Sequence, residues 1–78
     1  MNLKTAILSI LNSCGAYALP KSLLKTEAKT RLNGPVGDTD FTAALVFLED
    51  KGLVSSSVDP LTEDTRYTIT AIGKQAVQ

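Results

Sequence analysis

Three lysines at a spacing of four residues form the clearest chemical pattern in the sequence. Lys21, Lys25 and Lys29 would lie within roughly 80° of one another on a helix that turns about 100° per residue. Such a row of ammonium groups can contact phosphates along a nucleic-acid backbone, and it is also typical of a solvated helix face. The first interpretation predicts modest, salt-sensitive affinity for a polyanion.

Charge is divided unevenly between the two halves of the chain. Residues 1–36 carry five basic side chains and one acidic side chain, a net charge of +4. Residues 37–78 carry three basic and seven acidic side chains, a net charge of −4. This division favours a polyanionic partner for the basic half, or association through the two complementary halves.

The residue types that carry most enzyme chemistry are scarce. The 78 residues include no histidine and a single cysteine, Cys14, which excludes an internal disulfide and a multi-cysteine zinc site. We therefore expect no enzyme, no catalytic residues, no metal site and no cofactor. No apolar run approaches the roughly 20 residues of a membrane span, and a signal peptide is not evident, so we expect a cytoplasmic protein without membrane contact.

Hydrophobic periodicity and end signals predict seven elements in one domain over residues 1–78. The first half predicts a helix over Asn2–Ser13 that Gly15 ends, a strand over Ala16–Leu19, and a helix from Pro20 or Lys21 to Leu32. The second half predicts a helix from Asp38, strands over Leu53–Val58 and Thr65–Thr70, and a last helix over Ala71–Val77. In the last helix, Ile72 and Ala76 are expected to face inward, and Gly73 to permit close backbone approach.

The stretch Asp38–Leu53 carries the strongest helix signals. Gly37 and Asp38 suit its start, and Asp40 adds negative charge where the helix dipole favours it. Gly52 suits a left-handed residue just past the end. Its inward stripe is formed by Phe41, Ala44, Leu45 and Leu48.

Two motifs in the second half carry a family resemblance. Residues 45–54 read L-x-x-L-E-x-K-G-L-V, and after the predicted hairpin turn residues 66–73 read R-Y-x-I-T-x-x-G. With the order of the elements, these motifs make the chain resemble the winged helix-turn-helix superfamily, and small MarR- and PadR-type bacterial regulators within it. The resemblance implies an α+β fold with a three-helix core and a β-hairpin wing.

The same resemblance implies binding of double-stranded DNA in transcription regulation, with the protein acting as a dimer or beside a partner. The second helix would cross the phosphate backbone, and the helix from Asp38 would enter the major groove. The DNA-contacting residues expected on this basis are Lys21, Lys25, Lys29, Arg31, Thr39, Thr42 and Arg66.

The helix from Asp38 nevertheless lacks the side chains that make bidentate base contacts. Its leading turns hold no arginine, lysine, asparagine or glutamine, so Thr39 and Thr42 would give only weak base readout. Asp38 and Asp40 would be repelled by phosphates, and their alternative role is helix capping and dipole compensation. The hairpin turn is acidic as well, which leaves Arg66 as the candidate phosphate contact on the wing.

Several apolar residues lie off the predicted inward stripes. Val46 and Phe47 point away from the stripe of their helix with Ala43 near both, and Leu8 lies off the stripe of the first helix. Phe47 could pack against the first or last helix, and Leu8 could widen the core face. Alternatively, these four residues form a protein interface, either a homodimer or a contact with another protein. That alternative function is a winged-helix interaction module that binds no nucleic acid.

Overall fold

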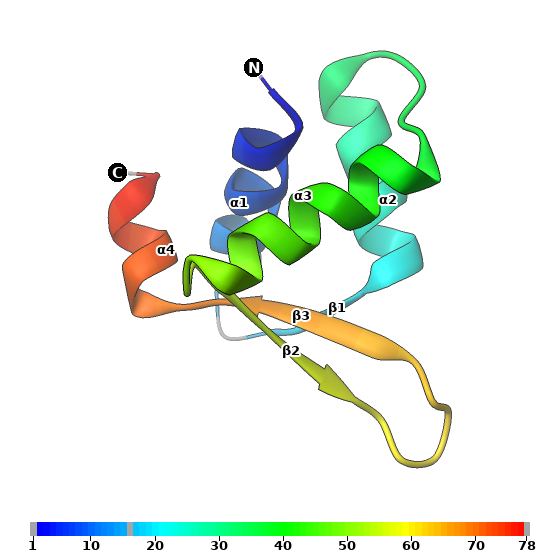
Figure 1. The fold of residues 1–78 in the computed structure, drawn as a ribbon, viewed down its shortest axis with the longest axis vertical. Coiled ribbons are helices and arrows are strands. Elements are labelled where there is room, and N and C mark those ends of the chain that lie inside the picture. The colour runs from blue at the N-terminus through cyan, green and yellow to red at the C-terminus, as the bar shows by residue number, and fades with distance from the viewer. Residues whose placement is uncertain (1, 16, 78) are drawn as a thin grey trace.

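The computed structural model describes residues 2–15 and 17–77, and the elements within these ranges follow the predicted order (Figure 1). The helices and strands are α1 (Leu3–Cys14), β1 (Leu19–Pro20), α2 (Lys21–Leu32), α3 (Asp38–Asp50), β2 (Val54–Val58), β3 (Thr65–Ile69) and α4 (Ala71–Ala76). The α2–α3 pair lies on one side of the sheet with α1, while the β2–β3 hairpin projects beyond the helices.

Helix α1 begins and ends where its capping residues predict. The Asn2 side chain accepts a hydrogen bond from the Thr5 amide at 2.8 Å, and Gly15 ends the helix with φ 63°. Leu8 is only 7% exposed and belongs to the hydrophobic core. Leu8 therefore widens the core face of α1, and the expectation that it joins a protein interface was wrong because its side chain is covered within the chain.

The turn between α2 and α3 positions the two helices. Asn33 adopts the left-handed conformation with φ 54°, and its amide donates to carbonyls of the last turn of α2. Gly37 then precedes α3, and buried Val36 anchors the connection in the core. At its other end α3 closes in a Schellman motif, in which the Leu53 amide donates to the Leu48 carbonyl at 2.9 Å and Gly52 has φ 72°.

The three strands form one antiparallel sheet in the order β1-β3-β2. Tyr67 of β3 lies opposite Leu19 of β1 on one side and Ser56 of β2 on the other. Strand β1 was predicted over Ala16–Leu19, but the paired residues are Leu19 and Pro20. The Tyr17 amide donates to the Cys14 carbonyl at 3.2 Å, so the chain is still turning there; Ala16 lies outside the described residues.

The core lies where α1, α2 and α3 meet the inner face of the sheet. Complete burial of a large apolar side chain stabilises the fold by roughly 1.5–3 kcal/mol. The largest fully buried side chains are Phe41, Ile7, Leu11, Leu24, Leu45 and Leu48. Three of these belong to α3, so this helix is held firmly by its inner stripe.

Helix α4 is fastened to the end of α3 by a set of contacts that we call the α3–α4 latch, formed by Gly52, Leu53, Thr70 and Gly73. The Thr70 hydroxyl donates to the Gly52 carbonyl at 2.6 Å and accepts from the Gly73 amide at 3.1 Å, while the Thr70 amide donates to the Leu53 carbonyl at 3.0 Å. A Cβ atom on Gly73 would lie 2.1 Å from the Leu53 carbonyl oxygen, which confirms the predicted close approach.

The inward face of α4 differs from the prediction. Ile72 is 58% exposed and Ala76 is also exposed, whereas Gly73 is buried and Val77 packs against the core. The prediction was wrong because a helix of six residues is too short for apolar spacing to define its buried side, and the backbone contact at Gly73 sets the orientation instead.

Candidate nucleic-acid interface

The basic residues of α2 do not form one uniform row. Lys21 and Lys25 turn toward α3, where the Lys21 ammonium donates to the Thr42 hydroxyl at 3.3 Å and Lys25 forms an ion pair with Asp38. Lys29 is exposed, and Arg31 donates to the Ser9 hydroxyl of α1 at 3.1 Å. The expected phosphate-binding residues therefore separate into two that face α3, one that faces solvent and one that reaches α1.

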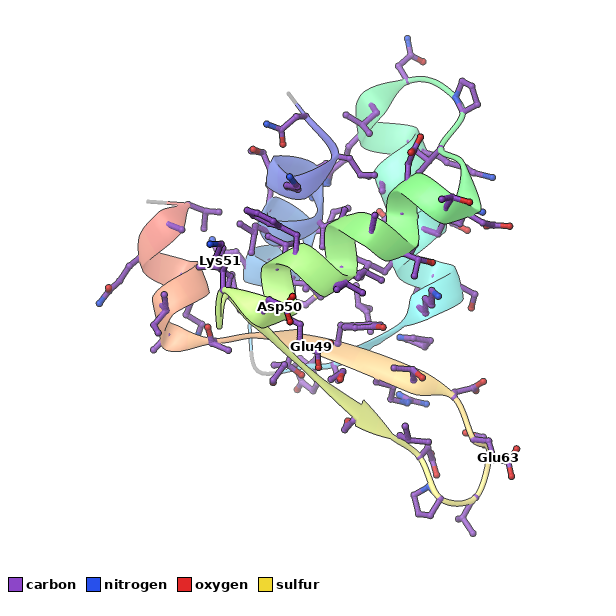
Figure 2. The ribbon with its side chains drawn as sticks, viewed as in Figure 1. Glu49, Asp50, Lys51 and Glu63 are labelled. Carbon is purple, nitrogen blue, oxygen red and sulfur yellow. The ribbon has the colours of Figure 1, made fainter. Side chains whose placement is uncertain are left out.

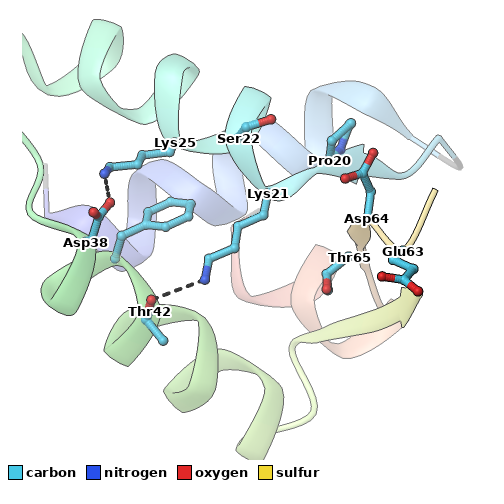
Figure 3. A pocket seen from close by; sticks show the side chains of 10 residues that line it. Pro20, Lys21, Ser22, Lys25, Asp38, Thr42, Glu63, Asp64 and Thr65 are labelled. Atoms are coloured by element: carbon cyan, nitrogen blue, oxygen red, sulfur yellow. Dashed lines mark hydrogen bonds and ion pairs between the residues drawn. The ribbon is translucent and has the colours of Figure 1, made fainter. Parts of the chain in front are cut away.

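Lys21 and Lys25 line a hollow of about 420 Å³ between the starts of α2 and α3 and the hairpin, which we call the α2–α3–hairpin hollow (Figure 3). Its lining is mixed in charge, since α2 supplies two lysines while α3 and the hairpin supply carboxylates. The lining residues are Pro20, Lys21, Ser22, Lys25, Asp38, Phe41, Thr42, Glu63, Asp64 and Thr65. The hollow thus brings together Lys21 and Lys25, two of the residues expected to contact phosphates, and Thr42, one of the two expected to contact bases.

The leading end of α3 is exposed, as a groove-entering helix requires. Thr39 and Thr42 are both exposed, and so are Asp38 and Asp40. No side chain caps this helix, because the N-cap residue is Gly37. Asp38 therefore does not cap the helix by a side-chain hydrogen bond. Instead, its carboxylate contacts a lysine of the preceding helix.

The hairpin tip is acidic and ordered by its own backbone. The Asp59 amide donates to the Asp64 carbonyl at 3.0 Å, and Glu63 adopts φ 61° at the tip (Figure 2). Arg66, the expected wing contact, lies away from this tip in the central strand, opposite Pro20 and Ser57. Its side chain is half-buried, and its Nε is buried without a hydrogen-bond partner in the described part of the chain.

A second surface of α3 is apolar and faces away from the core. Phe47 is 41% exposed, Val46 is 52% exposed, and Ala43 is exposed beside them. The Lys4 ammonium of α1 lies 3.8 Å from the centre of the Phe47 ring, within the range of a cation–π contact. Phe47 therefore packs partly against α1 while much of its ring surface remains open.

Comparison with known proteins identifies the architecture. No protein-family model and no curated protein matches the chain. Among solved structures, H. salinarum RosR is 26% identical with a TM-score of 0.83, and the match covers 99% of this chain and 66% of the RosR chain. A MarR-family transcriptional regulator from Silicibacter pomeroyi is 29% identical with a TM-score of 0.73, and the match covers 96% of this chain and 44% of the regulator. The chain belongs to the winged helix-turn-helix superfamily.

A third solved structure supports the fold of this winged helix-turn-helix domain. F93 from STIV, described as a winged-helix DNA-binding protein, is 20% identical with a TM-score of 0.77, and the match covers 94% of this chain and 76% of F93. The predicted fold class and resemblance to MarR-like regulators are thus confirmed. The domain spans about two thirds of the length of RosR and less than half of the S. pomeroyi regulator.

These relationships give each element of the winged helix-turn-helix domain its structural name. Helices α2 and α3 form the helix-turn-helix, and the β2–β3 hairpin is the wing. The S. pomeroyi protein is a transcriptional regulator and F93 is a DNA-binding protein, in keeping with the expectation that this chain is not an enzyme. None of the helices in residues 2–15 and 17–77 is long and apolar enough to cross a membrane.

Sequence analysis did not find the residues that surround the basic pair. Ser22 of α2 lines the hollow beside Lys21 and Lys25, and Glu63 and Asp64 reach it from the hairpin turn. The ion pair between Lys25 and Asp38 joins residues 13 positions apart on two different helices, so no helical periodicity signals it. Only the opposite charges of the two halves of the chain hint at such a contact.

Proposed function

We propose that this winged helix-turn-helix domain binds double-stranded DNA and acts in transcription regulation. The observation that carries the proposal is the position of Lys21 and Lys25 in the α2–α3–hairpin hollow, between the two helices of the helix-turn-helix and the wing. DNA binding by F93 and the regulatory role of the S. pomeroyi protein support the same function for the shared fold.

In this mechanism, α2 supplies phosphate contacts and α3 supplies weak base readout. The basic side chains of α2 neutralise phosphates along one DNA strand; they are Lys21, Lys25, Lys29 and Arg31. Arg66 offers a further phosphate contact from β3, beside the start of α2. Thr39 and Thr42 present hydroxyl groups that can donate to or accept from base edges. Affinity therefore depends mainly on phosphate contacts and discriminates little between sequences.

The direct test compares two double variants with the same change in charge. In Lys21→Ala/Lys29→Ala, we expect binding of a fluorescein-labelled random duplex to weaken about tenfold at low salt, because two phosphate contacts are lost. The slope of log affinity against log salt should become shallower by about 2. Fluorescence anisotropy over a salt series measures both quantities.

The matched control is Lys51→Ala/Lys74→Ala. Lys51 follows α3 next to α4, and Lys74 lies in α4, so both are remote from the start of α2 (Figure 2). This variant should keep its affinity within about twofold and its salt slope unchanged. Equal losses in both variants, or no binding by the unmodified chain at low salt, would refute phosphate binding by α2.

A second candidate function is association with a second copy through the apolar surface of α3. The exposure of Phe47 and Val46 favours it, and a hollow of about 470 Å³ lies beside Phe47. Lys4 and Asp40 both line this hollow, so two copies related by a two-fold axis could pair the Lys4 of each with the Asp40 of the other. Ala43 and Val46 neighbour Thr39 and Thr42 on α3, so this association would compete with DNA for one helix face.

A further inference from the structure

The ion pair between Lys25 and Asp38 joins α2 to the first residue of α3 (Figure 3). The Lys25 side chain is 23% exposed, whereas that of Asp38 is 88% exposed. The lysine is therefore held in the hollow, while its carboxylate partner stands at the surface. A phosphate that approached Lys25 from solvent would meet the Asp38 carboxylate first.

A carboxylate and a phosphate offer the same chemistry to an ammonium group, since both present anionic oxygen acceptors. A phosphate that binds Lys25 must displace Asp38 or share the lysine with a second negative charge. The neighbouring Lys21 is also engaged, because it donates to Thr42, although that partner is neutral. Of the two engaged lysines, Lys25 is thus the one whose partner repels phosphate.

Stabilisation of the fold does not account for the ion pair between Lys25 and Asp38. Gly37 is the N-cap, and Asp38 makes no side-chain capping bond. An ion pair with so exposed a carboxylate adds little to folding stability. Replacement of Asp38 by the similarly shaped asparagine should consequently leave the fold intact while freeing Lys25.

We infer that Asp38 is an affinity-determining residue, an internal competitor that occupies Lys25 and lowers the affinity of the domain for DNA. The inference rests on the proposed DNA binding and adds a residue whose removal strengthens it. Without Asp38, Lys25 is free to contact a phosphate and to release the counterions held there by the duplex. Both the affinity and the number of phosphates neutralised therefore rise. With Asp38 present, part of that gain is spent on breaking the ion pair.

The test is a double-mutant cycle of Asp38→Asn and Lys25→Ala, measured by anisotropy with a random duplex. Asp38→Asn should bind about fivefold more tightly at low salt, with a salt slope steeper by up to about 0.9, because Lys25 neutralises a phosphate only in part while Asp38 competes for it. In the Lys25→Ala background, the same substitution should gain at most about twofold, because no lysine is released. Asp38→Ser, which also removes the charge, should reproduce the result of Asp38→Asn.

Asp40→Asn is the matched control. Asp40 lies in the same first turn of α3 and is exposed, and no ion pair to it is present in the described residues. Its removal relieves general repulsion only, so its effect should be smaller than that of Asp38→Asn and the same with or without Lys25. Equal effects of the two substitutions in both backgrounds would overturn the competitor role.

The outcomes separate this inference from the proposed function. If Lys21→Ala/Lys29→Ala weakens binding while Asp38→Asn and Asp40→Asn behave alike, DNA binding stands and the competitor role falls. If neither the unmodified chain nor Asp38→Asn binds duplex at low salt, both fall. Binding that appears only after Asp38→Asn would show that Asp38 blocks Lys25, and it would overturn DNA binding by the unmodified domain.

Discussion

Tyr67 lies in the middle strand of the sheet, between Leu19 and Ser56. Burial raises the pKa of its hydroxyl above the ordinary value, and the negative charge of Glu49 raises the pKa further. Glu49 also accepts a hydrogen bond from the Ser56 hydroxyl at 2.6 Å, which holds the carboxylate over the sheet (Figure 2). The folded state therefore favours the protonated phenol.

This shift in pKa predicts a loss of stability in alkali. The unfolded chain releases the Tyr67 proton near pH 10 and the folded chain only at higher pH, so its contribution is complete below about pH 10 and is lost as the pH rises through the folded pKa. Tyr67→Phe should lose less free energy of unfolding than the unmodified chain as the pH rises above about 10. Urea denaturation at several pH values measures this difference.

Tyr17→Phe supplies the control, because Tyr17 is 81% exposed. Its pH dependence should follow that of the unmodified chain. If Tyr67→Phe shows the same alkaline loss as Tyr17→Phe, ionisation of Tyr67 does not contribute.

Single residues differ in how far sequence could place them. The cap at Asn2 and the left-handed residues at Asn33 and Gly52 were predictable, because each acts on backbone groups a few positions away. Lys25 and Asp38 could be recognised as charged and exposed, but their pairing depends on how α2 crosses α3. The sequence therefore predicted the candidate basic residues but not the contact that restrains one of them.

At the scale of elements, the α3–α4 latch depends on the missing side chain of Gly73. Gly73→Ala would place a methyl group 2.1 Å from the Leu53 carbonyl oxygen and 2.7 Å from Cγ1 of Ile69. We expect a loss of about 2–3 kcal/mol in the free energy of unfolding, because neither neighbour can yield without moving backbone or core. Urea denaturation followed by circular dichroism measures it.

Gly34→Ala serves as the comparison. The nearest atom to a Cβ at Gly34 is the Leu32 carbonyl oxygen at 3.9 Å, an ordinary contact, so stability should change by less than about 1 kcal/mol. Similar stability of the two variants would mean that α4 can shift without cost and that the latch is weak.

Elements with their own start and stop signals were predicted to within a residue or two, as α1, α2 and α3 illustrate. Elements that depend on contacts with other elements were predicted less closely. Strand β1 has two residues and exists only through pairing with β3, and the orientation of α4 follows from a backbone contact with Leu53. Such features depend on tertiary contacts that a local pattern does not contain.

At the scale of the whole molecule, the apolar surface of α3 predicts self-association. Phe47→Ser should shift the protein toward the monomer, because it removes the largest exposed apolar side chain from that surface. Light scattering coupled to size exclusion, over a range of protein concentrations, measures the molar mass.

Leu61→Ser is the control for that experiment. Leu61 is 92% exposed at the hairpin tip, so its substitution removes similar hydrophobicity far from the α3 surface and should leave the molar mass unchanged. A monomer at every concentration before substitution, or equal effects of the two substitutions, would contradict association through Phe47. A complex with a different protein would instead assign this surface to a heterologous partner.

The α3–α4 latch also has a mechanical meaning for the molecule. It fixes α4 to the end of α3 opposite Thr39 and Thr42, and the 13 residues of α3 span about 20 Å at 1.5 Å per residue. Because Phe41, Leu45 and Leu48 also hold α3 in the core, α3 and α4 form one rigid unit. A rotation of that unit by about 5° would carry the leading turn of α3 by nearly 2 Å over that length, more than enough to make or break a hydrogen bond. The positions of the Thr39 and Thr42 hydroxyl groups therefore depend on contacts made as far away as α4.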